Sequence, residues 1–217
     1  MFAPNKFLTF VTIIYAGSIA ILFILGYSVG QVDMIKWFNI IHTPFLDQLF
    51  ASLTLLGTAI IFIPFLVVAV FQRFSLAIGL VGNAILQSLV VSLFKRVLFP
   101  KAPRPIQFLD ADTVHRVPGV SIHHWMSFPS GHTVTIFGLC VFVSLWTKNY
   151  WMSAALLLLA ILVGVSRMYL TQHFPIDVAT GAFFGSTIGA YTYMLTEYWN
   201  KSNWMNERIN LPGSNRN

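Results

Sequence analysis

Three short polar blocks interrupt an otherwise apolar chain and contain the residue types that could do chemistry. They are KRVLFPKAPRP at 95–105, FPSGHT at 128–133 and SRMYLTQHFPID at 166–177. Each block lies at the edge of a hydrophobic stretch, where polar groups can meet water and a lipid headgroup together. Because an ionisable side chain at membrane depth is costly, these blocks are the first candidates for a functional site.

The third block pairs a histidine with a carboxylate. His173 and Asp177 are four residues apart with Pro175 between them, and proline favours the first turn of a helix. A carboxylate one turn inside that helix could accept a proton from one ring nitrogen and leave the other nitrogen free to attack. The positive end of the helix would also favour an anion bound at the ring. The alternative is structural, with a capping histidine and a carboxylate that stabilises the first turn.

The second block predicts the start of a helix that could bind an anion. Gly131 permits close backbone approach, and Ser130 is a candidate N-cap. Several backbone N–H groups and the Ser130 hydroxyl would then point at the same anion. His132 could protonate a leaving alkoxide or phosphate as a general acid. Taken alone, His132 is better explained as a loop histidine beside a cap.

The first and third blocks also supply cations. Arg104 and Arg167 could each clamp phosphate oxygens bidentately, and Lys95 adds a point charge. The alternative is that these side chains only contact anionic headgroups. Two histidines, an orienting carboxylate, a glycine-containing helix start and several cations are together what phosphoryl transfer through a phosphohistidine requires.

The composition identifies the environment of these blocks. The 217 residues are 56% hydrophobic and only 9% charged, with a mean hydropathy of +0.72, whereas soluble domains carry about 25% charged residues. A soluble enzyme and a disordered regulator are therefore excluded. The net charge is +6 because 13 Lys and Arg outnumber 7 Asp and Glu. The basic residues are spread over the whole chain and do not form the dense basic stripe of a nucleic-acid-binding protein. The composition is that of an integral membrane protein.

The elements that must position the blocks are membrane-spanning helices. Spanning a bilayer takes about 20 mostly apolar residues in a helix, and the chain contains six apolar runs. We therefore predict an all-α fold of six transmembrane helices in a single bundle, with residues 1–217 forming one domain. Gly181, Gly185 and Gly189 recur every four residues in the last run, which favours close packing inside the chain over a dimer face. The six runs are 7–29, 48–71, 74–94, 133–147, 150–166 and 178–196.

The distribution of Lys and Arg gives an orientation. With six spans the two termini share a side, and six Lys and Arg lie on that side. The opposite side has seven, or four once Lys95, Arg104 and Arg167 are set aside as candidate phosphate ligands. The remaining bias favours termini in the cytoplasm and an outward-facing loop over 95–128. Exposed aromatic residues such as Trp37, Trp151 and Tyr198 are expected at the two membrane interfaces.

The three blocks in this order resemble the motifs of the type 2 phosphatidic acid phosphatase (PAP2) superfamily of membrane lipid phosphatases. The second block matches in full as 129–132, and the third as Ser166, Arg167, five residues, His173, three residues and Asp177. The first block departs from the pattern, because eight residues separate Lys95 from Arg104 where the family usually has six. That departure leaves Arg96 or Lys101 as alternatives for the lysine's role.

The resemblance implies a role for each matched residue. His173 would be the nucleophile that forms a phosphohistidine, Asp177 would orient it, and His132 would protonate the leaving group and later help to activate water. No metal and no cofactor are expected. The phosphoryl oxygens would be held by Lys95, Arg104, Ser130, Gly131 and Arg167.

The resemblance also implies a substrate and a location. The substrate would be a membrane lipid phosphate or diphosphate, with undecaprenyl diphosphate placed ahead of phosphatidylglycerol phosphate and phosphatidic acid. The protein would lie in a bacterial inner membrane with its site on the extracytoplasmic face, and no nucleic-acid partner is expected. The alternatives are a lipid A phosphatase or phosphotransferase, a haloperoxidase, and a non-catalytic lipid binder or transporter. The oligomeric state stays open.

Overall fold

A computed structural model describes residues 6–110, 112–199 and 207–208. Within these ranges every regular element is helical, in agreement with the predicted all-α class. The α-helices are α1 (Lys6–Ser28), α2 (Gln31–Ile40), α3 (Pro44–Leu53), α4 (Phe62–Gln72), α5 (Phe74–Ser92), α6 (Gly131–Thr147), α7 (Tyr150–Tyr169) and α8 (Pro175–Trp199). The shorter elements are the 3-10 helices η1 (Thr54–Gly57), η2 (Ala59–Ile61) and η4 (Pro105–Phe108) and the π-helix η3 (Leu93–Leu98).

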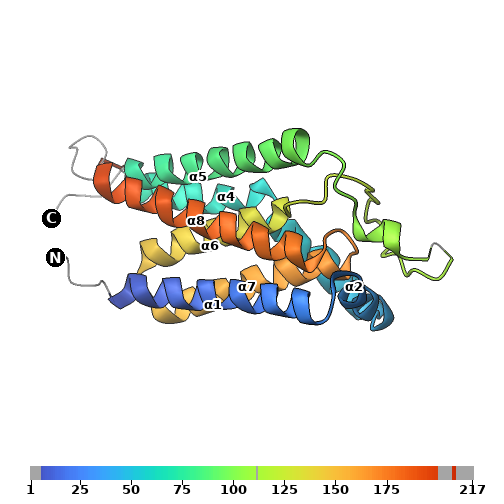
Figure 1. Cartoon of the computed structure of the whole chain (residues 1–217). Helices are drawn as coiled ribbons and strands as arrows, with labels where there is room; N and C mark the ends of the chain where they lie inside the picture. The colour runs from blue at the N-terminus through green and yellow to red at the C-terminus, as the bar shows by residue number, and fades with distance from the viewer. Residues whose placement is uncertain (1–5, 111, 200–206, 209–217) are drawn as a thin grey trace.

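The long helices run back and forth along one bundle (Figure 1). The first turn of α1 and the last turn of α8 lie at one end, while α2 and the loop that carries η4 lie at the other. Consequently the last turns of α5 and α7 and the first turns of α6 and α8 all meet at the end opposite the termini. Each polar block of the sequence belongs to one of these turns or to the adjoining loops, so the bundle brings the three blocks together at this end.

Several helices have the length and composition of membrane spans. Lys6–Ser28, Phe74–Leu98 and Tyr150–Tyr169 are long and apolar enough, and Pro44–Gly57 with Ala59–Gln72 forms a fourth span if the pair is counted as one. Their outward faces are apolar, with Ile13, Ile24 and Leu89 more than 60% exposed, as expected of side chains that face lipid.

The two remaining predicted spans, over 133–147 and 178–196, differ from these helices in length or in polarity. The apolar helix α6 has only 17 residues, and α8 has 25 residues but is interrupted by hydroxyl side chains such as Thr180, Ser186 and Thr192. The prediction over 48–71 also differs from the structure, because Thr58 adopts an extended backbone and the helix axis bends by 66° there.

Helix α6 lies at the centre of the bundle and contacts α8 along a glycine stripe. A Cβ atom on Gly185 or Gly189 would lie 2.4 Å from the Val134 carbonyl oxygen or 2.3 Å from the Gly138 carbonyl oxygen. Gly181 is nearly as close, with the Ser130 carbonyl oxygen 2.8 Å away. The predicted packing of this stripe inside the chain is therefore confirmed, since only glycine lets the two backbones approach so closely.

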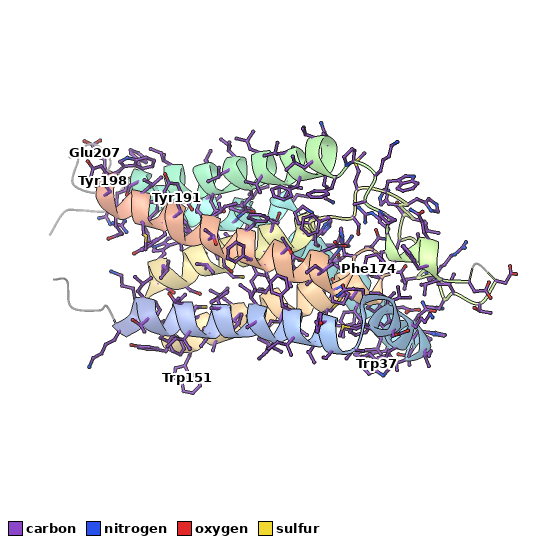
Figure 2. All side chains as sticks on the ribbon, viewed as in Figure 1. Trp37, Trp151, Phe174, Tyr191, Tyr198 and Glu207 are labelled. Atoms are coloured by element: carbon purple, nitrogen blue, oxygen red, sulfur yellow. The ribbon has the colours of Figure 1, made fainter. Side chains whose placement is uncertain are left out.

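Aromatic side chains mark both ends of the bundle (Figure 2). Trp37 lies at the end that carries the polar blocks, whereas Trp151 and Tyr198 lie toward the end that carries the termini. All three are more than half exposed, as expected of amphipathic rings at the two membrane–water interfaces.

The glycine stripe leads to a stability prediction. Gly189→Ala would force α6 and α8 apart, because the new methyl group meets a backbone atom that has no rotamer to change. We expect a loss of about 1–3 kcal/mol, measured as a lower thermal midpoint in detergent. Gly17→Ala in α1 is the matched control, since nothing lies within 4 Å of its Cβ position. Equal midpoints for the two variants would contradict the prediction.

Candidate active site

The candidate site centres on His173, which is 1% exposed. Its Nδ1 atom lies 3.5 Å from Asp177 Oδ2 and 3.5 Å from Ser127 Oγ. The Ser127 hydroxyl donates to the same carboxylate oxygen at 2.5 Å. One side of the ring thus faces a carboxylate and a hydroxyl, an arrangement that favours a proton on Nδ1 and a free lone pair on Nε2.

Asp177 also caps the helix that carries it. Pro175 begins α8 as predicted, and Asp177 Oδ2 accepts a hydrogen bond of 2.9 Å from the Phe174 backbone N–H. This is half of a capping box, in which a side chain at the third helical position satisfies the backbone donor before the first turn. One oxygen atom, Asp177 Oδ2, therefore makes both the capping contact with the Phe174 backbone N–H and the contact with His173.

Arg167 approaches the site from the last turn of α7. Its side chain is buried, and its Nη1 donates to Thr54 Oγ1 at the end of α3. Its Nε is buried without a hydrogen-bond partner in the described residues. A buried guanidinium N–H without an acceptor is costly, and an anion oxygen at this position would remove that cost.

Lys95 is the half-buried cation of the first block, whereas the alternatives Arg96 and Lys101 are exposed. Lys95 lies in the π-helix Leu93–Leu98 that ends α5. A π-helix accommodates an extra residue in a turn and is frequent at functional sites. The longer spacing between Lys95 and Arg104 thus coincides with a local change of helix type.

Arg104 is positioned differently from the prediction of a bidentate phosphate clamp. Its Nε donates to the Trp125 carbonyl oxygen at 2.9 Å, and its Nη1 donates to the carbonyl and side-chain oxygens of Gln172 at 3.0 and 2.9 Å. Its Nη2 lies 3.5 Å from the Met126 carbonyl oxygen. Because these bonds use most of its donors, Arg104 ties the loop to the turn before α8 while its charge stays near His173.

Two polar residues of the site escaped the sequence analysis. Gln172 also donates through Nε2 to the Ser121 carbonyl oxygen at 3.0 Å, so it links the loop, Arg104 and the turn before His173. Ser127 contacts both His173 and Asp177. Gln172 lies inside the third block and Ser127 directly precedes the second, and these positions are the only signal the sequence offered.

The second block forms the start of α6, with Ser130 at the predicted N-cap position. The Ser130 hydroxyl makes no capping bond and instead accepts a hydrogen bond of 2.9 Å from Thr133 Oγ1. The Ser130 backbone N–H donates to the Asp177 carbonyl oxygen at 3.1 Å. This bond joins the first turn of α6 to the first turn of α8.

His132 and Gly131 line a hollow of about 280 Å³ between α4, α5 and α6. Gln87 and Ser92 of α5 contribute polar groups, while Phe62 and Val91 contribute apolar ones. We call this space the His132 hollow. Its lining therefore combines polar and apolar groups.

The remaining histidines lie outside the site. His115 Nε2 lies 2.9 Å from Asp47 Oδ2, and its ring stacks on His42 with centroids 3.8 Å apart. His123 and His124 are exposed. Among the described residues, no three His, Cys, Asp or Glu side chains come together in a way that could hold a metal ion.

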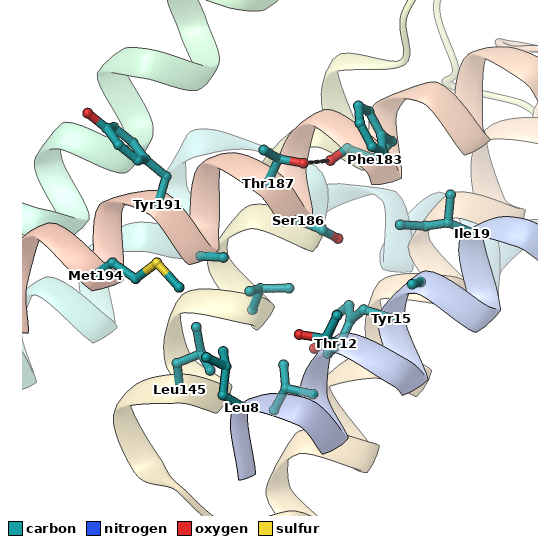
Figure 3. A pocket seen from close by; sticks show the side chains of 14 residues that line it. Leu8, Thr12, Tyr15, Ile19, Leu145, Phe183, Ser186, Thr187, Tyr191 and Met194 are labelled. Carbon is teal, nitrogen blue, oxygen red and sulfur yellow. Dashed lines mark hydrogen bonds between the residues drawn. The ribbon is translucent and has the colours of Figure 1, made fainter. Parts of the chain in front are cut away.

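A second hollow of about 430 Å³ lies between α1, α6 and α8 (Figure 3). Its lining is mostly apolar, with Leu8, Ile19, Leu145 and Met194 among the side chains. None of the site residues contributes to it. This second hollow is therefore separate from the candidate site.

Burial and the neighbouring charges together lower the pKa of His173. Burial is the main cause that holds the pKa of His173 well below its usual 6.5, and the positive charges of Lys95, Arg104 and Arg167 lower it further. His132 acts in the same direction. The ring is therefore neutral at neutral pH, as a nucleophilic imidazole must be.

Comparisons with known proteins connect this geometry with a family. The sequence model of the PAP2 superfamily matches residues 76–201. Lipid A 4'-phosphatase of Bacteroides thetaiotaomicron is 26% identical over 179 residues, which cover 76% of this chain and 76% of that protein. YbjG of Escherichia coli strain K12, provisionally named an undecaprenyl-diphosphatase, is 32% identical over 107 residues, which cover 48% of this chain and 50% of that protein. The crystal structure of Aquifex aeolicus LpxE superimposes with a TM-score of 0.66 and 28% identity, covering 76% of this chain and 94% of that one.

The low pKa of His173 can be measured directly. In ¹⁵N-histidine-labelled protein, the ring signal absent from a His173→Asn variant should still be that of a neutral imidazole below pH 6.5, where an ordinary histidine is mostly charged. A signal that titrates near pH 6.5 would contradict the assignment.

The same shift predicts a pH dependence of stability. Below about pH 6.5 the unfolded chain binds a proton at residue 173 that the folded chain excludes, so stability should fall as the pH drops through that value. The thermal midpoint should therefore decline less in His173→Asn than in the wild type between about pH 7.5 and 5.5. Equal declines would show that residue 173 contributes nothing to this dependence.

Proposed function

The chain belongs to the PAP2 superfamily, and from this premise we propose that it removes a terminal phosphate from a membrane lipid through a phosphohistidine at His173. The observation that carries the proposal is the buried, neutral His173 ring, which has Asp177 and Ser127 on one side and three cations nearby. A structural histidine does not need three neighbouring cations, whereas a nucleophile toward a phosphate dianion does. The proposal treats residues 1–217 as a single catalytic domain.

The reaction has two steps. His173 Nε2 attacks phosphorus and the bond from phosphorus to the lipid oxygen breaks, while His132 gives its proton to that oxygen. Water then attacks the phosphohistidine and loses a proton to His132, which releases inorganic phosphate and restores both rings. Asp177 stabilises the positive charge that forms on the His173 ring, as a carboxylate does beside a catalytic imidazole.

The phosphoryl oxygens would be held by Arg167, Lys95 and the start of α6. Arg167 offers its unpartnered Nε, Lys95 offers a point charge, and Gly131 offers a backbone N–H with the Ser130 hydroxyl beside it. Arg104 contributes its charge and holds the loop in place. With these cations the mechanism needs no metal ion to neutralise the transferring group.

The protein is an integral membrane protein, and we propose that α1, the α3–α4 pair, α5, α6, α7 and α8 each cross the bilayer. The exposed apolar faces and the two aromatic ends support this arrangement. A lipid tail would then enter laterally through the His132 hollow between α4 and α5. With Lys95, Arg104 and Arg167 set aside as phosphate ligands, six Lys and Arg on the side of the termini against four on the other support a site on the extracytoplasmic face of a bacterial inner membrane.

The similarity to lipid A 4'-phosphatase extends over most of both chains, so a lipid A phosphate is the first substrate to test. The shorter similarity to YbjG favours undecaprenyl diphosphate as the second candidate. Both are phosphates on an apolar anchor, which is the common feature that the mixed lining of the His132 hollow would accept.

The proposal predicts phosphate release that depends on two histidines. Lipid A, undecaprenyl diphosphate, phosphatidylglycerol phosphate and phosphatidic acid would be assayed in detergent micelles containing chelator. We expect release from at least one lipid, a loss of about 10³-fold or more in His173→Ala and of about 10²–10⁴-fold in His132→Ala. A ³²P-labelled intermediate that is stable to alkali and labile to acid should form in the wild type and be absent from His173→Ala.

The control for this assay is His42→Ala, because His42 is exposed and its ring contacts the Asn39 carbonyl oxygen and His115 rather than a residue of the site. Its activity should match that of the wild type. Release that survives in His173→Ala would disprove the phosphohistidine, and no release from any lipid would favour a non-catalytic lipid binder on the same fold.

A further inference from the structure

The bend in the α3–α4 pair contacts two residues of the site. Helix α3 continues into η1 (Thr54–Gly57), the backbone becomes extended at Thr58, and the chain resumes as η2. The Thr58 hydroxyl donates to the Leu55 carbonyl oxygen at 2.7 Å, which closes the bend on itself. We call the four residues Thr54–Gly57 the η1 corner. A straight apolar helix would span the bilayer equally well, so the hydropathy of this segment does not explain its bend.

Thr54 sets the orientation of Arg167. Its Oγ1 atom accepts a hydrogen bond from Arg167 Nη1, across 113 positions of the sequence. With Nη1 held on this side, the guanidinium plane cannot rotate freely, and Nε is left buried without a partner. An arginine fixed by one nitrogen presents its remaining donors in a defined direction, which a bidentate anion contact requires.

Gly57 sets the position of His132. A Cβ atom on Gly57 would lie 2.6 Å from His132 Cβ and 2.9 Å from His132 Cδ2. The first of these neighbours is bonded directly to the backbone of α6, so a change of rotamer could not relieve the overlap. Gly57 is buried in this contact. The requirement for glycine is therefore one of space beside the His132 side chain.

We propose that the η1 corner is a positioning element of the reaction, in which Thr54 aims Arg167 and Gly57 seats His132. The inference rests on the proposed function and adds two residues outside the three polar blocks. Both contacts lie in the last turn before the backbone becomes extended at Thr58, so the corner and the bend are adjacent in the chain. Neither residue needs to touch the substrate, since each acts through a side chain that does.

The hydroxyl of Thr54 can be tested by a matched series. Thr54→Val removes the acceptor at nearly constant shape, Thr54→Ser restores it, and Thr58→Val removes a neighbouring hydroxyl that bonds only within the bend. We expect Thr54→Val to lose about tenfold in kcat/KM with its thermal midpoint close to that of Thr58→Val, and Thr54→Ser to recover most of the loss. Thr54→Val as active as Thr58→Val, or a serine that rescues nothing, would overturn the role of Thr54.

The space at Gly57 is tested by Gly57→Ala, with Gly82→Ala as the control because nothing lies within 4 Å of the Cβ position of Gly82. A displacement of His132 by about an ångström should lower kcat by about 100-fold with little change in KM and should alter the pH profile of kcat. A wild-type kcat and pH profile would overturn the role of Gly57. If Gly57→Ala does not fold, the Thr54 series still decides whether the corner acts on the site.

Failure of this inference differs from failure of the proposed function. The inference fails if the wild type releases phosphate and the Thr54 and Gly57 variants behave like their controls. The proposed function fails, and the inference with it, if the wild type releases phosphate from none of the lipids. The wild-type assay alone therefore separates the two outcomes.

Discussion

The close contact of α6 with α8 is the constraint on which the rest of the site depends. Glycines on α8 allow the two backbones to approach until a carbonyl oxygen of α6 occupies the space of a side chain. The same contact extends to the first turns, where the Ser130 backbone N–H bonds to the Asp177 carbonyl oxygen. Because both helices begin at this point, a histidine beside each start lies at the same end of the bundle. Close backbone packing thus determines the relative position of two side chains that are 41 residues apart in the sequence.

The site brings several positive charges together around a buried histidine. The charges that act on Lys95 come from Arg104, Arg167 and a single acid among the described residues, Asp177. The buried Nε of Arg167 has no partner, and the buried ring of His173 is held neutral by its surroundings. Cations held close together with a single counter-charge destabilise a folded protein, and in the proposed function the same cations would stabilise a bound phosphate.

Several groups in the site have a structural and a chemical role at once. Asp177 caps α8 and faces His173 through the same oxygen atom. Arg104 crosslinks the long loop to Gln172 while its charge acts on the site. These double roles follow from burial, since most buried polar groups are stabilised by hydrogen-bond partners inside the protein. Substitutions at such residues will therefore change folding and chemistry together, which makes Thr54, Gly57 and their controls the more informative positions.

The sequence alone determined the class of the fold, the residues that could do chemistry and the glycine stripe, because each follows from local composition or short spacing. Apolar runs predict helices, Pro175 predicts the start of α8, and glycines four residues apart predict close packing. The tertiary structure alone decided that Arg104 is tied to Gln172 and that Ser127 bridges His173 and Asp177. It also decided that the span over 48–71 bends at Thr58, directly after the residues that contact Arg167 and His132. These features depend on contacts between residues far apart in the chain. A side chain's free donors are known only once all its neighbours are known, and the sequence does not contain that information in any local pattern.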